Sequence, residues 1–151
     1  MTEVRFYHLQ RSTLESVLPK LLERVIERGK RAVVLVDSPE RVEALNVHLW
    51  TYDDRAFLPH GSTRDGYAAN QPIWLTDSDE NPNGAAILFQ GDGAESARVG
   101  EYETCVDLFD GNDAAAVGRA RERWQRYKSA GHSVHYFQQD EQGRWEEKAR
   151  D

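Results

Sequence analysis

The stretch "RAVVLVDS", residues 31–38, decides the fold class. Its residues 32–36 form a continuous apolar run, which is typical of a strand buried on both faces of a sheet. The preceding residues 11–30 repeat apolar side chains at intervals of three and four, which predicts an amphipathic helix. Residues 4–9, "VRFYHL", alternate as a short strand does. Strand, helix and buried strand in this order predict a βαβ unit with two parallel strands.

Capping residues mark the ends of the first helix. Ser12 or Thr13 is expected at its N-cap, and Glu15 lies three residues after Ser12, as in a capping box. Pro19 falls early in the helix, where we expect it to kink or tighten the first turns. Gly29 is expected to end the helix, because glycine adopts the left-handed conformation that closes many helices.

The remaining segments continue the alternation of helices and strands. We predict a second helix at 38–50, strands at 72–77, 85–91 and 103–110, a last helix at 111–131 and a terminal hairpin at 132–148. Residues 51–71 lack periodicity and are expected to form an extended surface loop. The sequence therefore predicts one α/β domain over residues 1–151, with a largely parallel central sheet and helices on both faces.

Composition narrows the classes of function. The formal net charge is −7, which argues against a protein whose main task is to grip nucleic-acid phosphates. Cys105 is the only cysteine, so no disulfide can form within the chain, and we interpret it as a small buried hydrophobe. Neither a signal peptide nor an apolar run of membrane-spanning length is visible, so we expect a soluble, cytoplasmic protein without membrane contact.

Motifs for cofactors or metals are weak. The first strand-to-helix turn, residues 8–13, has no glycine to admit a phosphate group, and no Walker A motif is present. The acidic loop 77–88 resembles a calcium loop, but Pro82 and Leu88 stand where glycine and glutamate are needed. We therefore expect neither a cofactor nor a metal ion. No histidine lies in a zinc or triad spacing; His60, which lies in a loop, is the first candidate for a functional role, but a turn-stabilising role is favoured for it.

One catalytic alternative stays open. Asp107, Asp110 and Asp113 lie three residues apart at the end of a predicted strand. Asp107 and Asp110 could hold magnesium in a small nucleotide-dependent hydrolase, although a strand-to-helix turn capped by an aspartate explains the pattern more simply.

Residues 119–131, "RARERWQRYKSAG", concentrate cations beside aromatic residues. A helical wheel puts the apolar side chains on one arc: Val117, Ala120, Trp124 and Tyr127. It puts Arg121 and Lys128 at the edge of this arc and the other arginines opposite: Arg119, Arg123 and Arg126. The arc is either a core stripe bordered by cations or an apolar notch with a cationic rim. A notch of this kind suits a peptide that ends in a hydrophobic residue and a free carboxylate.

A second candidate surface contains two large aromatic residues. Trp50 closes the second predicted helix, and Phe57 follows it in the loop. Tryptophan and phenylalanine are typical anchors of protein interfaces. The alternative is that both side chains cover the edge of the sheet.

The segments 4–9, 29–50, 57–61 and 120–131 together resemble the chi subunit family of bacterial DNA polymerase III holoenzyme, in order and with similar spacing over nearly the whole chain. The resemblance implies a Rossmann-like, three-layer α/β fold that binds no nucleotide. It also implies a non-catalytic accessory subunit, associated with the clamp loader, that pairs with the psi subunit. Finally, it implies docking of the acidic, phenylalanine-ending tail of single-stranded DNA-binding protein.

By matching position, the resemblance assigns tail binding to residues of the last helix: Val117, Arg121, Trp124, Gln125 and Lys128. Val117 and Gln125 stand where the family has lysines, so we expect a less basic rim. Trp50 and Phe57 match aromatic residues that face psi, or a helicase that competes for the same surface. The overall negative charge predicts no direct contact with nucleic acid.

Overall fold

The computed structural model describes residues 1–53, 55 and 57–150. The α-helices are α1 (Leu14–Glu27), α2 (Pro39–Thr51) and α3 (Ala114–Ser129). The strands are β1 (Glu3–Leu9), β2 (Ala32–Leu35), β3 (Gly61–Ser62), β4 (Ile73–Thr76), β5 (Ile87–Gln90), β6 (Thr104–Asp110), β7 (Ser133–Gln139) and β8 (Trp145–Arg150). Two short 3₁₀-helices, η1 (Ala68–Asn70) and η2 (Val99–Glu101), lie in the connections.

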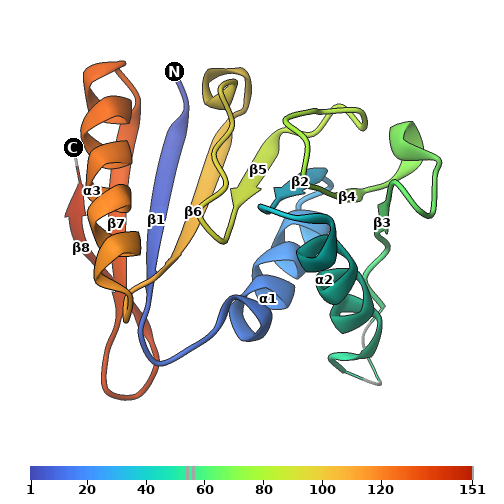
Figure 1. Cartoon of the computed structure of the whole chain (residues 1–151), viewed down its shortest axis with the longest axis horizontal. Helices are drawn as coiled ribbons and strands as arrows, with labels where there is room; N and C mark the ends of the chain where they lie inside the picture. The colour runs from blue at the N-terminus through green and yellow to red at the C-terminus, as the bar shows by residue number, and fades with distance from the viewer. Residues whose placement is uncertain (54, 56, 151) are drawn as a thin grey trace.

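The strands form one eight-stranded sheet in the order β3-β4-β2-β5-β6-β1-β7-β8 (Figure 1). Every neighbouring pair is parallel except β7 and β8, which form the antiparallel terminal hairpin. Strand β1 lies between β6 and β7, and its Phe6 is in register with Asp107 on one side and Tyr136 on the other. The predicted largely parallel sheet is therefore confirmed.

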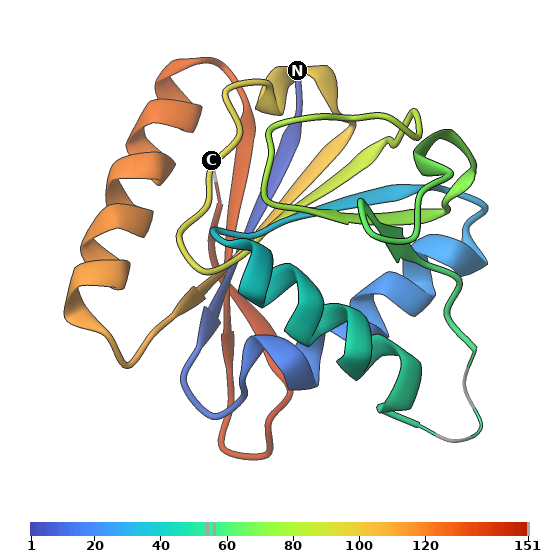
Figure 2. The ribbon, with the colours of Figure 1, turned by 45° about the vertical axis from the view of Figure 1, so that its right-hand side comes forward.

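Helices cover both faces of this sheet, as predicted. Figure 2 shows α1 and α2 together on one face and α3 on the other. The buried side chains divide accordingly into two clusters. One joins the sheet to α1 and α2 through residues such as Leu18 and Leu45, and the other joins it to α3 through Ala120 and Tyr127. The α/β architecture is thus confirmed.

The start of α1 differs from the expected capping box. Thr13 is the N-cap: its hydroxyl accepts from the Ser16 amide at 3.2 Å, and the Ser16 hydroxyl accepts from the Thr13 amide at 3.0 Å. The expected Ser12–Glu15 pairing is wrong because the helix begins one residue later. Inside the helix, Pro19 cannot donate to the carbonyl of Glu15. The His48 ring of α2 takes that role at 2.6 Å, which leaves the carbonyl satisfied.

Capping residues and glycines also mark the ends of the other elements. Ser38 and Asp113 cap α2 and α3, and the glycines Gly29, Gly131 and Gly143 have positive φ where α1, α3 and the hairpin turn end. Residues 51–71 contain β3 and η1, so the prediction of an extended loop there is only partly right; Asp54 and Ala56 lie outside the described residues. Within the described ranges, no helix is both long and apolar enough to cross a bilayer.

Candidate functional site

A cavity of about 490 Å³ lies between α3 and the sheet strands beneath it. Its helical wall consists of Val117, Ala120, Arg121, Trp124 and Gln125, so it contains four of the five residues predicted for tail binding. Its sheet side consists of Phe6, His8, Phe109, Tyr136, Gln138 and Ala149. Lys128, the fifth predicted residue, is exposed one turn further along α3 and does not line the cavity.

Aromatic rings form the floor and the inner wall of the cavity. The ring of Phe6 lies 6.4 Å from Phe109 and 5.7 Å from Trp124 between centroids. Tyr136 stacks on Phe109 at 6.4 Å and meets Trp124 edge to face at 6.5 Å. Because Trp124 is only half-buried, the apolar arc of α3 is partly core and partly an open notch. The two interpretations given above, a core stripe and an apolar notch, therefore each describe part of the arc.

Polar groups are few and lie at the border of this apolar space. Arg121 and Gln125 are exposed on α3, and across from them the hydroxyl of Tyr136 hydrogen-bonds with Nδ1 of the buried His8. Burial lowers the pKa of His8, and the positive charge of Arg121 lowers it further, whereas the Gly111 backbone and Asp110 act in the opposite direction. Burial raises the pKa of Tyr136, and Arg121 opposes that rise. Arg121 thus influences the opposite wall electrostatically.

A buried ion pair anchors α3 to the sheet, and sequence reasoning missed it. Arg123 is 4% exposed and Asp107 is 1% exposed. The guanidinium donates from Nε to Oδ2 at 2.7 Å and from Nη2 to Oδ1 at 2.9 Å, and Gln90 donates to the same carboxylate at 3.0 Å. The wheel placed Arg123 opposite the apolar arc, and this prediction is wrong. The available signal was Asp107 itself, because a carboxylate inside an apolar strand needs a partner.

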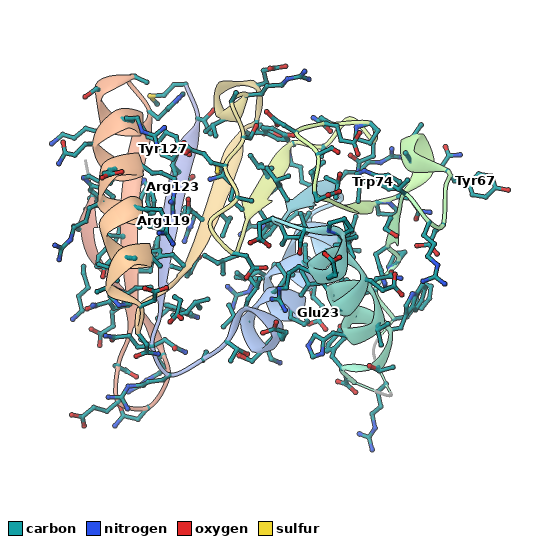
Figure 3. The ribbon with its side chains drawn as sticks, in the orientation of Figure 1. Glu23, Tyr67, Trp74, Arg119, Arg123 and Tyr127 are labelled. Carbon is teal, nitrogen blue, oxygen red and sulfur yellow. The ribbon has the colours of Figure 1, made fainter. Side chains whose placement is uncertain are left out.

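This pair also engages Asp107, one of the two carboxylates of the hydrolase alternative. Both oxygens of Asp107 accept hydrogen bonds, and burial raises its pKa while Arg123 limits that rise. Asp113 is occupied by the amides of the first turn of α3, as the simpler explanation expects. In the part of the chain that the structure describes, no three His, Cys, Asp or Glu side chains are grouped to hold a metal ion. Figure 3 shows Arg119, Arg123 and Tyr127 following one another along α3.

The carboxyl ends of the central strands border a second cavity of about 750 Å³. Sheets of this class often bind nucleotides at such a position. Here the guanidinium of Arg41, which lines the cavity, pairs with Glu15 at 2.5 Å and with Asp92 at 2.7 Å. Carboxylates already neutralise this cation, and the rest of the lining is mixed in charge, with Asp37, Asp110 and Asp113 beside Arg11 and Arg119. Arg41 is therefore engaged by its own carboxylate partners.

The second predicted surface is exposed. Trp50 is 50% exposed and Phe57 is 76% exposed, with ring centroids 6.1 Å apart. Trp50 lies 4.2 Å from the ring of His60, which is buried and hydrogen-bonds the carbonyls of Leu58 and Asn46. The two aromatic residues therefore do not fill the sheet edge. His60 holds the turn, as favoured from the sequence.

Cys105 lies fully buried in β6. Burial raises the pKa of its thiol well above the ordinary value, so the thiolate, which is the nucleophilic form, is disfavoured. The interpretation of Cys105 as a small core side chain is confirmed.

Comparison with known proteins identifies the family of the chain. The family described as DNA polymerase III chi subunit, HolC, matches residues 1–135. A relative from Rickettsia prowazekii (strain Madrid E), named "Probable DNA polymerase III subunit chi", is 30% identical over 109 residues. That match covers 72% of this chain and 66% of the relative, slightly less than two thirds of the relative's length. The chain therefore belongs to the DNA polymerase III chi subunit family, which connects it with DNA replication.

Proposed function

We propose that the chain is a non-catalytic accessory subunit of DNA polymerase III that docks the acidic, phenylalanine-ending tail of single-stranded DNA-binding protein. The observation that carries the proposal is the cavity beside α3, where an aromatic floor meets the exposed guanidinium of Arg121. A terminal phenylalanine offers the two matching groups, a ring and a free carboxylate, on one residue.

The size and lining of the cavity fit such an occupant. Its volume of about 490 Å³ falls inside the range of about 300–1,000 Å³ that is typical of small-ligand sites. Phe6, Phe109 and Trp124 provide ring faces and edges against which a docked ring can pack. Arg121 presents a planar fork that can hold a carboxylate through two parallel hydrogen bonds. Gln125 adds an amide at the same border.

The charge distribution supports a protein tail rather than a nucleic acid as the partner. The whole chain has a net charge of −7, so single-stranded DNA meets long-range repulsion. Local cations on α3 attract a short acidic segment at close range. We therefore expect tail binding to weaken with added salt.

We further propose that Trp50 and Phe57 form the surface that contacts psi, or a helicase that competes for it. Their exposure and mutual contact support this assignment, because large exposed aromatics are typical interface anchors. This surface lies at the end of α2, away from α3, so both partners can bind at once (Figure 1).

Titration with a peptide of several aspartates ending in phenylalanine tests the tail proposal. We expect Arg121→Ala to weaken binding by about tenfold or more, because a charge-assisted hydrogen bond contributes about 1.5–3 kcal/mol. Arg119→Ala is the matched control, since Arg119 is also exposed on α3 but does not line the cavity. Wild-type affinity in Arg121→Ala would show that the site is assigned wrongly. A gel-shift with single-stranded DNA at moderate salt should show no complex.

A further inference from the structure

The cavity beside α3 has a wall that lies beyond the family match. The match ends at residue 135, and the lining residues Tyr136, Gln138 and Ala149 follow it. They belong to β7 and to β8, which pairs with β7 in the terminal hairpin. This part of the chain therefore closes the side of the cavity that faces α3.

The hydroxyl of Tyr136 is the best-placed polar group on this wall. It hydrogen-bonds with Nδ1 of His8 and accepts from Nε2 of Gln138 at 3.2 Å. Its ring is fixed between Phe109 and Trp124. A hydroxyl with this many neighbours has a defined position, and it lies across the cavity from the helical wall that contains Arg121.

The protonation of His8 decides what the Tyr136 hydroxyl can offer. When Nδ1 of His8 carries no proton, the tyrosine O–H donates to it. When Nδ1 carries the proton, the ring donates to the tyrosine oxygen, and the O–H is free to donate into the cavity. The Nε2 atom of His8 is buried against the backbone of Gly111 and makes no hydrogen bond of standard geometry among the described residues, so the ring proton can lie on either nitrogen.

We propose that the Tyr136 hydroxyl, oriented by His8 and Gln138, is a second donor for the terminal carboxylate of the docked peptide, opposite Arg121. The inference rests on the proposed tail-docking function and adds a binding residue from outside the family-matched region. A carboxylate between the two walls receives the guanidinium from α3 and the phenol O–H from β7. His8 is then a positioning residue, which makes this donor available by holding the proton on Nδ1.

A double-mutant cycle with two peptides tests the inference. The peptides share several aspartates and a final phenylalanine, and one has a free terminal carboxylate whereas the other ends in an amide. We expect Tyr136→Phe to weaken binding of the free-carboxylate peptide by about tenfold and to leave the amide peptide nearly unchanged. Tyr67→Phe is the matched control, because it deletes the hydroxyl of an exposed tyrosine at the far end of the molecule (Figure 3).

The outcomes separate the inference from the function on which it rests. If wild type binds the free-carboxylate peptide and Tyr136→Phe binds it equally well, the second donor is refuted and tail docking stands. An equal loss for both peptides would show that the hydroxyl supports the cavity wall through His8 and Gln138 and does not contact the terminal carboxylate, which also overturns the inference. If wild type binds neither peptide, the docking function fails, and the inference fails with it.

Discussion

The cavity beside α3 and the aromatic surface at the end of α2 illustrate two ways of preparing a protein for a partner. The first is concave, lined by rings that contact one another, and bordered by a cation. The second exposes Trp50 and Phe57, and neither residue lines either of the two cavities described above. A concave site with a charged border can recognise one chemical group, such as a chain end. Exposed rings depend instead on the area that they bury against a complementary surface.

The two regions also differ in how they are held in place. Helix α3 is tied to β6 by the buried pair of Arg123 and Asp107. The exposed aromatics are supported by His60, whose ring is bonded to backbone carbonyls and lies beneath Trp50. The cavity therefore requires a rigid helix position, whereas the aromatic surface requires only a fixed turn.

The largest expected effect concerns the anchor of α3. Arg123→Ala leaves the Asp107 carboxylate buried without its partner, so we expect the free energy of unfolding to fall by about 3–5 kcal/mol. Chemical denaturation measures this change. Arg126→Ala is the control, because Arg126 pairs with Glu95 at the surface, where such pairs contribute about 0–1 kcal/mol. Equal losses in the two variants would mean that the buried pair does not anchor the helix.

A compensated variant sharpens this test. Replacing both partners, as in Asp107→Leu with Arg123→Met, removes the uncompensated charge and should recover most of the stability. A double variant as unstable as Arg123→Ala would contradict the explanation by an unpaired carboxylate, and would point to packing instead.

The next effect distinguishes the two surfaces from each other. Trp50→Ala should weaken binding to psi by about 2 kcal/mol, because exposed tryptophans at interfaces are frequent hot spots. The same variant should bind the acidic peptide like wild type, and Arg121→Ala should bind psi like wild type. Calorimetric titration of each variant with each partner gives the four values. If either variant weakened both partners equally, the two regions would not be independent sites.

The sequence predicted the elements of the fold well because their signals are local. Apolar periodicity marked α1, a continuous apolar run marked the buried strand β2, and caps such as Ser38 and Asp113 depend only on neighbouring residues. The predicted Ser12–Glu15 pairing was wrong because a local pattern does not distinguish neighbouring candidates. Thr13 and Ser16 offer an equivalent pattern one residue later.

The candidate site was predicted only on its helical side. Val117, Arg121, Trp124 and Gln125 share a face of α3, which a helical wheel reveals. The opposite wall comes from β1, β6 and the terminal hairpin, and its contribution depends on which strand lies beside which. The order β6-β1-β7 brings three distant segments together beneath α3, and no pattern within one segment shows this.

The burial of Arg123 escaped prediction for a related reason. At about 100° per residue Arg123 lies roughly 40° from Tyr127, beside the apolar arc, but a wheel does not show that a charged side chain is buried; that requires knowledge of its partner on β6. Asp107 supplies that partner from 16 positions away in the sequence. The same holds for Tyr136 and His8, which are 128 positions apart and meet only because β1 and β7 pair.

The smallest expected effect is on the pH dependence of the unfolding free energy. It concerns His8, which lines the α3 cavity. Burial, which has the largest effect, and the charge of Arg121 lower the pKa of His8 in the folded protein. In the unfolded chain its pKa is about 6.5, so the unfolded state binds more protons as the pH falls below that value. The contribution of His8 to stability is therefore fully present at higher pH and is lost as the pH falls below about 6.5 toward the folded pKa. His8→Asn should flatten this decline in the unfolding free energy measured by denaturation between about pH 7.5 and pH 5.5. Other histidines and carboxylates titrate equally in both proteins, so the difference between the two profiles isolates His8. Parallel profiles would mean that His8 titrates alike in the folded and unfolded states, and that the cavity wall does not hold it neutral.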